Sequence, residues 1–78
     1  MVFLLEYDRK RGALKMLRPF RDSERSLAEK ARLDLELSLN KRGVGHEVVL
    51  LEARDEAALR KTHRRYFEDL AGLSKAAA

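Results

Sequence analysis

The chain has no cysteine and no tryptophan among its 78 residues, and only one proline. Without cysteine, a disulfide framework and a thiolate zinc site are both excluded. Three phenylalanines and two tyrosines are the only aromatic residues, so the core has to be built mainly from leucine and valine. A domain of this size buries only about 60% of the surface that its unfolded chain exposes. Because such small domains are often stabilised by association, the composition predicts a homodimer.

Long apolar runs are also missing, since no stretch reaches the roughly 18 residues that a membrane span requires. The apolar start of the chain is interrupted by Glu6 and Asp8, which is too early for the core of a signal peptide. We therefore expect a cytoplasmic protein without membrane association. No linker or internal repeat divides the sequence, which predicts a single compact α+β domain over residues 1–72 and a frayed C-terminal tail over residues 73–78.

The first part of the chain has the pattern of a β-hairpin. Val2–Tyr7 (VFLLEY) is a short apolar segment, and after the polar DRKRG the segment ALKMLRPF resumes with looser alternation. Gly12 supplies the positive φ that such a turn often needs. Lys15, Arg18 and Pro19 suit the edge of a sheet, because charge discourages further pairing and proline cannot donate to a ladder. The second segment is therefore predicted to be the outer strand.

The next segment, DSERSLAEKARLDLELSLNKRG, is predicted to be a helix. Asp22 or Ser23 would cap its first turn and Gly43 would end it. Leucine recurs at every second position from Leu33 to Leu39, which is strand spacing. The alternative is therefore a strand over Arg32–Leu39 that pairs with the following segment through the turn NKRGVGH. Helix is favoured because leucine, glutamate, alanine and lysine are strong helix formers, whereas aspartate and serine are poor strand residues.

This helix would be apolar on two sides. At 100° per residue one stripe consists of Leu27, Ala28, Ala31, Leu35 and Leu39. Leu33 and Leu37 lie on roughly the opposite side, where the chain's own sheet cannot cover them, and they form one candidate dimer interface. A second candidate is the apolar segment EVVLLEA that follows, because an unguarded edge strand around Val49 could pair with its symmetry mate.

The last helix is predicted to begin after a cap at Asp55 and to end at Gly72. Its apolar stripe would consist of Leu59, Thr62, His63, Tyr66, Phe67 and Leu70. The order of elements is then β-β-α-β-α, and a right-handed crossover puts the third strand beside the first. The expected fold is a two-layer α+β domain with a three-stranded sheet of order 2-1-3 and both helices on one face.

No pattern of residues identifies a catalytic site. His63 and Tyr66 are three residues apart on an apolar stripe, where a packed histidine and a core tyrosine are the simpler interpretation. His46, Glu47 and His63 could supply metal ligands, but nothing in their spacing requires it. The GVG segment lacks the residues of a phosphate-binding loop. We expect no enzyme activity, no metal and no cofactor, and an enzyme using His63, Tyr66 or His46 is the least supported hypothesis.

The net charge of +4 is a small excess, but the basic residues are clustered. The candidate nucleic-acid contacts are Arg9, Lys10, Arg11, Lys41, Arg42, Arg64 and Arg65. In the predicted topology they would gather at one end of the sheet. Because no aromatic stacking motif or helix-turn-helix pattern accompanies them, any binding would be weak and directed to phosphates. The sequence thus predicts a small self-associating interaction module of unknown specific function, with weak, largely sequence-independent nucleic-acid binding as the alternative.

Overall fold

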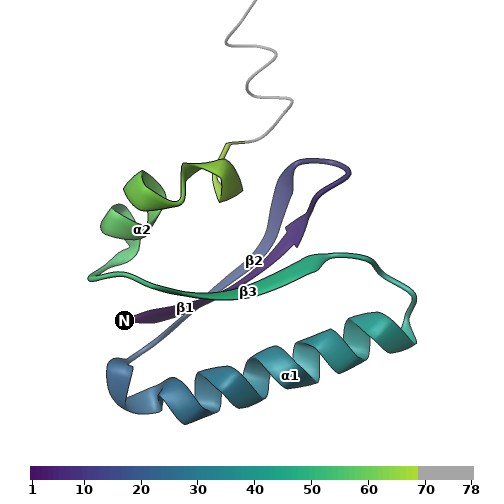
Figure 1. The fold of residues 1–78 in the computed structure, drawn as a ribbon, viewed down its shortest axis with the longest axis horizontal. Helices are drawn as coiled ribbons and strands as arrows, with labels where there is room; N and C mark the ends of the chain where they lie inside the picture. The colour runs from purple at the N-terminus through teal and green to yellow at the C-terminus, as the bar shows by residue number, and fades with distance from the viewer. Residues whose placement is uncertain (69–78) are drawn as a thin grey trace, which may run out of the picture.

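A computed structural model describes residues 1–68 of the chain. Its elements are β1 (Val2–Asp8), β2 (Ala13–Phe20), the 3₁₀ turn η1 (Asp22–Glu24), α1 (Arg25–Lys41), β3 (Glu47–Glu52), α2 (Glu56–Thr62) and the 3₁₀ turn η2 (Arg64–Tyr66). The strands form a single antiparallel sheet of order β2-β1-β3, so the α+β class and the strand order are confirmed. Figure 1 shows the sheet between α1 and α2.

The β1–β2 hairpin turns where the sequence predicts. The Asp8 carboxylate accepts the backbone N–H groups of Lys10 (3.0 Å) and Arg11 (3.2 Å). These bonds, above all the one from Arg11, lower the pKa of Asp8. Gly12 closes the turn with a φ of 63°. The pairing shifts by one residue opposite Glu6 and Tyr7, which leaves Lys15 without a partner on β1 as a β-bulge.

The central strand β1 is buried on both faces, and this decides where the helices lie. Val2 and Leu4 pack with α1 on one face of the sheet. Phe3, Leu5 and Tyr7 pack on the other face with residues of α2 and η2. The predicted two-layer arrangement with both helices on one face is therefore wrong: the helices cover opposite faces (Figure 1). An apolar strand without polar alternation needs cover on each side.

The helix prediction for the leucine-rich segment is confirmed, and the strand alternative is wrong. Gly43 follows the helix with a φ of 68°, as a C-terminal glycine should. The predicted caps at Asp22 and Ser23 are wrong, because both residues lie in η1 and α1 begins at Arg25. Asp22 instead pairs with the N-terminal amino group at 2.9 Å, which lowers the pKa of Asp22.

α1 buries a narrower stripe than the sequence predicts. Ala28 and Leu39 are buried against the sheet, whereas Leu27 is 58% exposed. Leu27 lies on the flank of α1 that faces β2, and α1 packs more closely against β1 and β3 than against β2. Leu33 and Leu37 are 55% and 52% exposed, as predicted for the opposite side of the helix.

α2 is shorter than predicted. Asp55 caps it as expected, because its carboxylate accepts the Ala58 N–H at 2.8 Å, which also lowers the pKa of Asp55. The helix ends at Thr62, since His63 leaves the helical region with φ −123° and ψ 51°. The turn η2 then sets Tyr66 edge-on against Tyr7, with ring centroids 5.2 Å apart. The predicted positions of Leu70 and Gly72, and the tail at 73–78, lie outside the described residues.

Because α2 covers one face of the sheet, we predict that alanine substitutions at two leucines differ strongly in their effect on the free energy of unfolding. Leu59 is fully buried and Leu37 is 52% exposed. We expect Leu59→Ala to lower the free energy of unfolding by about 2 to 5 kcal/mol because it leaves a cavity. Leu37→Ala should change it by less than about 0.5 kcal/mol. Urea denaturation of both variants measures the difference, and equal losses would contradict the packing of α2 described above.

Candidate functional site

The outer edge of β3 is not paired with another strand within residues 1–68. Ala53 N–H donates to the Met1 carbonyl at 3.1 Å, and the Met1 amino group donates to the Ala53 carbonyl at 2.9 Å. In an antiparallel ladder every second pair bonds in this way, so by the observed register the odd-numbered residues of β3 bond to β1. The backbone N–H and C=O groups of Val48, Leu50 and Glu52 therefore point away from β1, toward the open edge.

The two edges of this sheet are protected very differently. On β2, the bulged Lys15 and the exposed Arg18 and Pro19 discourage a further strand, as predicted. β3 (EVVLLE) pairs with β1 without a bulge, and its four central residues are all apolar. Strand edges of this kind are the ones that accept another strand.

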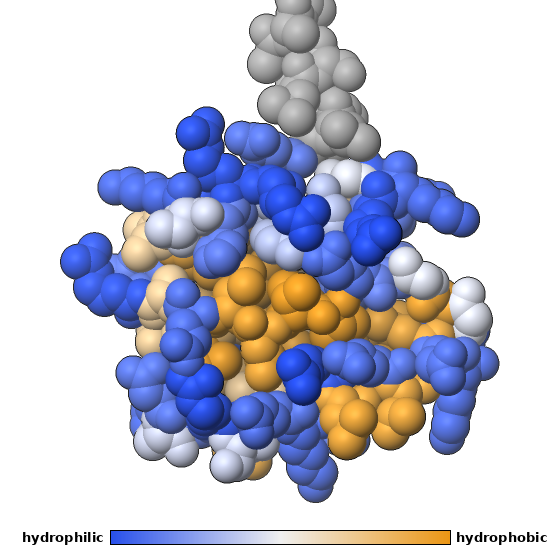
Figure 2. Space-filling view, viewed as in Figure 1, coloured by the Kyte–Doolittle hydropathy of each residue, from blue (hydrophilic) through white to orange (hydrophobic). Residues whose placement is uncertain are grey.

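The side chains of β3 are apolar and only partly covered. Val49 and Leu51 pack at the margin of the core under α2, and Val48 and Leu50 at the margin of the core over α1. In Figure 1 β3 crosses in front of β1, and Figure 2 shows an apolar band on the same face, bordered by hydrophilic side chains above and below. The candidate interface residue Val49 therefore lies within an apolar strip at the open edge.

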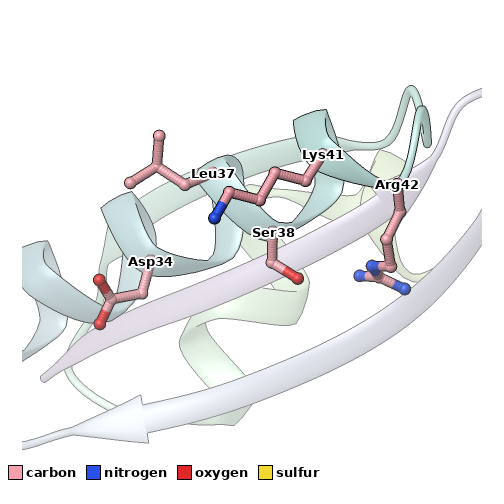
Figure 3. Close-up of a pocket in the computed structure, with 5 residues that line it drawn as sticks. All are labelled: Asp34, Leu37, Ser38, Lys41 and Arg42. Carbon is pink, nitrogen blue, oxygen red and sulfur yellow. The ribbon is translucent and has the colours of Figure 1, made fainter.

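The other candidate interface residues lie elsewhere. Leu33 and Leu37 are on the side of α1 that faces away from the sheet, so the structure does not bring them together with Val49. Leu37 lines a shallow surface hollow together with polar and charged residues (Figure 3). The residues that line this hollow are Asp34, Leu37, Ser38, Lys41 and Arg42. Leu37 and Leu33, one helical turn apart, thus form a small exposed apolar spot on α1 that is separate from the apolar strip of β3.

A polar cluster beside β3, on the α2 face, is absent from the sequence prediction. Tyr66 donates its hydroxyl hydrogen to the Glu47 carboxylate, and Arg65 donates to the same carboxylate at 2.8 Å and to the Tyr66 oxygen at 2.7 Å. The bond from Tyr66, with Arg65 beside it, lowers the pKa of Glu47. Burial and the bond to Glu47 raise the pKa of Tyr66. The spacing of residues gives no signal of this contact, because Glu47 and Tyr66 are 19 residues apart in the sequence and meet only when α2 and η2 pack on the sheet.

His46 makes a second polar cluster on the opposite face. Its Nδ1 lies 2.5 Å from Glu6 Oε2, and its Nε2 lies 3.6 Å from Asp8 Oδ2. The imidazole therefore links β1 to the start of β3. His63 belongs to the connection between α2 and η2 on the other face, so the two histidines do not meet. Within residues 1–68, no group of three or more His, Cys, Asp or Glu side chains is arranged to hold a metal ion.

The predicted basic patch is divided by the sheet. Arg9 at the hairpin and Arg65 after α2 share the Glu47 carboxylate, at 3.9 Å and 2.8 Å. Arg64 pairs with Glu68 at 3.7 Å, and Arg11 pairs with Asp8 at 3.8 Å. Lys10 is exposed at the hairpin tip. Lys41 and Arg42 lie at the end of α1, on the opposite face from Arg64 and Arg65. The candidate basic residues therefore lie on both faces of the sheet, because the helices that carry them cover opposite faces.

The Glu47–Tyr66 contact predicts a pH-dependent contribution to stability. Because the pKa of Glu47 is lowered from 4.5, its carboxylate stabilises the fold above about pH 4.5, and this contribution is lost as the pH falls through the lowered value. We expect Tyr66→Phe to cost about 1 to 2 kcal/mol at pH 7 and progressively less as the pH is lowered to 3 and the Glu47 carboxylate becomes protonated. Urea denaturation at both pH values tests this.

Tyr7→Phe is the matched control for that experiment. Tyr7 packs edge-on against Tyr66 but takes no part in the hydrogen bonds to Glu47. Its effect should be small and equal at the two pH values. A Tyr66→Phe loss that is the same at pH 3 as at pH 7 would contradict the role given to the Glu47 carboxylate.

Within residues 1–68, no helix combines the length and the apolar character needed to cross a membrane. Comparison with protein-family models, with curated proteins and with solved structures finds no match to this chain. The open edge of β3 and the basic residues around the hairpin are therefore the main guides to its function.

Proposed function

We propose that this protein is a self-associating module, and that the free edge of β3 pairs with the β3 edge of a second copy to extend the sheet through a homodimer. The observation that carries the proposal is the contrast between the edges: β2 carries a bulged lysine, an arginine and a proline, whereas β3 is an apolar strand without a bulge. A two-fold axis lets the same strand serve both subunits.

The edge of β3 is favoured over the exposed leucines of α1 as the surface for association. Pairing at β3 would satisfy the outward N–H and C=O groups of Val48, Leu50 and Glu52 and would also cover apolar side chains. Association through Leu33 and Leu37 would cover two leucines but would also desolvate Asp34, Lys41 and Arg42 around them. The edge is therefore favoured because pairing there satisfies backbone groups that association through the leucines of α1 would leave open.

Sedimentation of two lysine variants separates these surfaces. Val49→Lys adds a charge at the open edge and should abolish or greatly weaken the dimer. Leu37→Lys, on the outer side of α1, should leave the dimer intact, because Leu37 lies outside the proposed interface. Urea denaturation of both variants confirms that each is folded before its mass is interpreted.

The wild-type chain decides whether the proposal stands. A single species with the mass of a monomer over the whole accessible concentration range would remove it. If the Leu37→Lys variant were monomeric and the Val49→Lys variant remained dimeric, the interface would lie on α1 and not at the edge of β3.

Weak nucleic-acid binding is a second candidate function. It is favoured by one contact: Arg9 and Arg65 come from distant parts of the chain and share the Glu47 carboxylate, so the hairpin and η2 present their basic residues together. Arg9, Arg11, Arg64 and Arg65 each pair with a carboxylate of the chain, which reduces the positive charge available to phosphates. This candidate is the weaker of the two for that reason.

A salt titration tests the second candidate. Each phosphate that the protein neutralises should steepen the fall of log affinity with log salt by roughly 0.9 on duplex DNA. Replacing Arg9, Lys10 and Arg11 together by serine should make this slope shallower. The matched control replaces Arg21, Lys30 and Arg54 by serine, which removes the same charge from exposed positions away from the hairpin. Equal losses in both triple variants, or no binding at low salt, would reject a hairpin site.

A further inference from the structure

One flank of α1 carries a regular alternation of charge beside the open edge of the sheet. Arg25, Glu29, Arg32 and Glu36 are spaced by four, three and four residues, so they lie along one side of the helix. Arg25 pairs with Glu52 at the end of β3, and Glu36 lines a hollow with His46 and Val48 at its start. These contacts locate the flank next to β3, on the side away from β2.

This order of charges is complementary to itself when two copies run antiparallel. Read from Arg25 the flank is plus, minus, plus, minus, and read from Glu36 it is minus, plus, minus, plus. In an antiparallel pair Arg25 of one copy therefore faces Glu36 of the other, and Glu29 faces Arg32. A two-fold axis between two β3 edges makes the α1 helices antiparallel. In each copy α1 packs against β1 and β3. The axes of the two α1 helices in the dimer would therefore be roughly 10 Å apart, which is about the spacing of packed helices.

The midpoint of the flank agrees with the midpoint of the strand. It falls between Lys30 and Ala31, about 8 Å along the helix from Arg25 at a rise of 1.5 Å per residue. Arg25 is level with Glu52, to which it is bonded. A distance of about 8 Å corresponds to two or three strand residues, which is the region of Val49 and Leu50.

The backbone narrows the choice of register further. A two-fold axis perpendicular to the sheet places the α1 helices of both copies on the same face of the extended sheet. Residues that pair across the axis must then have their side chains on the same face. Because side chains alternate between faces along a strand, the axis has to pass beside a residue and not between two residues. An axis beside Val49 joins the outward groups of Val48 to those of Leu50 in the other copy, and sets His46 opposite Glu52. An axis beside Leu50 joins the outward groups of the two Leu50 residues to each other and those of Val48 to those of Glu52. The second arrangement pairs all three outward residues of β3 but places the Glu52 carboxylate opposite the apolar Val48. The first places Glu52 opposite a polar residue, so we favour it for its lower desolvation cost.

We infer that the β3 strands of two copies pair antiparallel about an axis beside Val49, with the charged flanks of the two α1 helices side by side as the second part of the interface. The inference rests on the proposed self-association and adds its register and its helical contacts. It also accounts for how a short strand could support a dimer, since strand pairing alone buries less than the area of a stable interface.

Single cysteines test the register, because the chain has none of its own and any disulfide must join two copies. With the axis beside Val49, the two Val49 residues are a pair without mutual hydrogen bonds, about 4.5 Å apart at Cα, which suits a disulfide. The two Leu50 residues are then about 8 Å apart at Cα, which does not. We expect Val49→Cys to form a covalent dimer readily under mild oxidation and Leu50→Cys to remain mostly monomeric on a non-reducing gel.

The possible results lead to different conclusions. Faster cross-linking of Leu50→Cys than of Val49→Cys would overturn the register but keep the β3 interface. A wild-type dimer in which neither variant cross-links would overturn both the register and pairing through β3. A monomeric wild type would overturn the proposed function itself.

Charge reversal tests the helical contacts separately. Glu36→Arg places like charges opposite each other twice in the dimer and should raise its Kd roughly tenfold at low salt. Adding Arg25→Glu to Glu36→Arg restores complementarity between the copies but removes the Arg25–Glu52 pair within each copy, and it should lower the Kd at least threefold below that of Glu36→Arg alone. Lys30→Glu, outside the flank, is the control and should have little effect. An unchanged Kd in Glu36→Arg would remove α1 from the interface while leaving β3 pairing in place.

Discussion

Burial of β1 on both of its faces is the constraint on which the rest of the fold depends. Val2 and Leu4 face α1, whereas Phe3, Leu5 and Tyr7 face α2 and η2. A strand that is apolar on both sides has to be central in its sheet and has to be covered twice. The chain meets this with a long helix on one face and with a short helix and a 3₁₀ turn on the other. Both layers are thin, which leaves little apolar area to stabilise a chain of this size.

A three-stranded sheet has two outer strands, and the open edges of these strands decide whether a strand of another molecule can pair with the sheet. β2 carries a bulged lysine, an arginine and a proline, and β3 carries none of these. Central positions in β3 are apolar, and their outward backbone groups lack a partner strand within residues 1–68. The proposed dimer would convert this edge into an internal part of a larger sheet and add burial that the monomer lacks.

Polar contacts at the hairpin end of the sheet fix the start of β3 from both faces. His46 bonds to Glu6 on the α1 face, and Glu47 accepts bonds from Tyr66 and Arg65 on the α2 face. The simplest role for these contacts is to hold the strand in place, because every buried side-chain polar atom among residues 1–68 has a partner. A strand held in this way presents its free edge in a defined orientation.

Local signals in the sequence determined the elements and the strand order. Gly12 and Gly43 occupy the positive-φ positions predicted for them, and Asp55 caps α2, because turns and caps depend on nearby backbone geometry. The exposure of Leu33 and Leu37 followed from helical periodicity. The uninterrupted run VFLL also carried the signal for helices on both faces, since a strand with one covered face alternates with polar residues. Only the tertiary structure decided the rest: the division of the basic residues by the sheet, the contact of Glu47 with Tyr66, and which backbone groups of β3 face the open edge. These depend on how distant segments cross and on the register of β1 with β3, and neither is encoded in the spacing of residues along the chain.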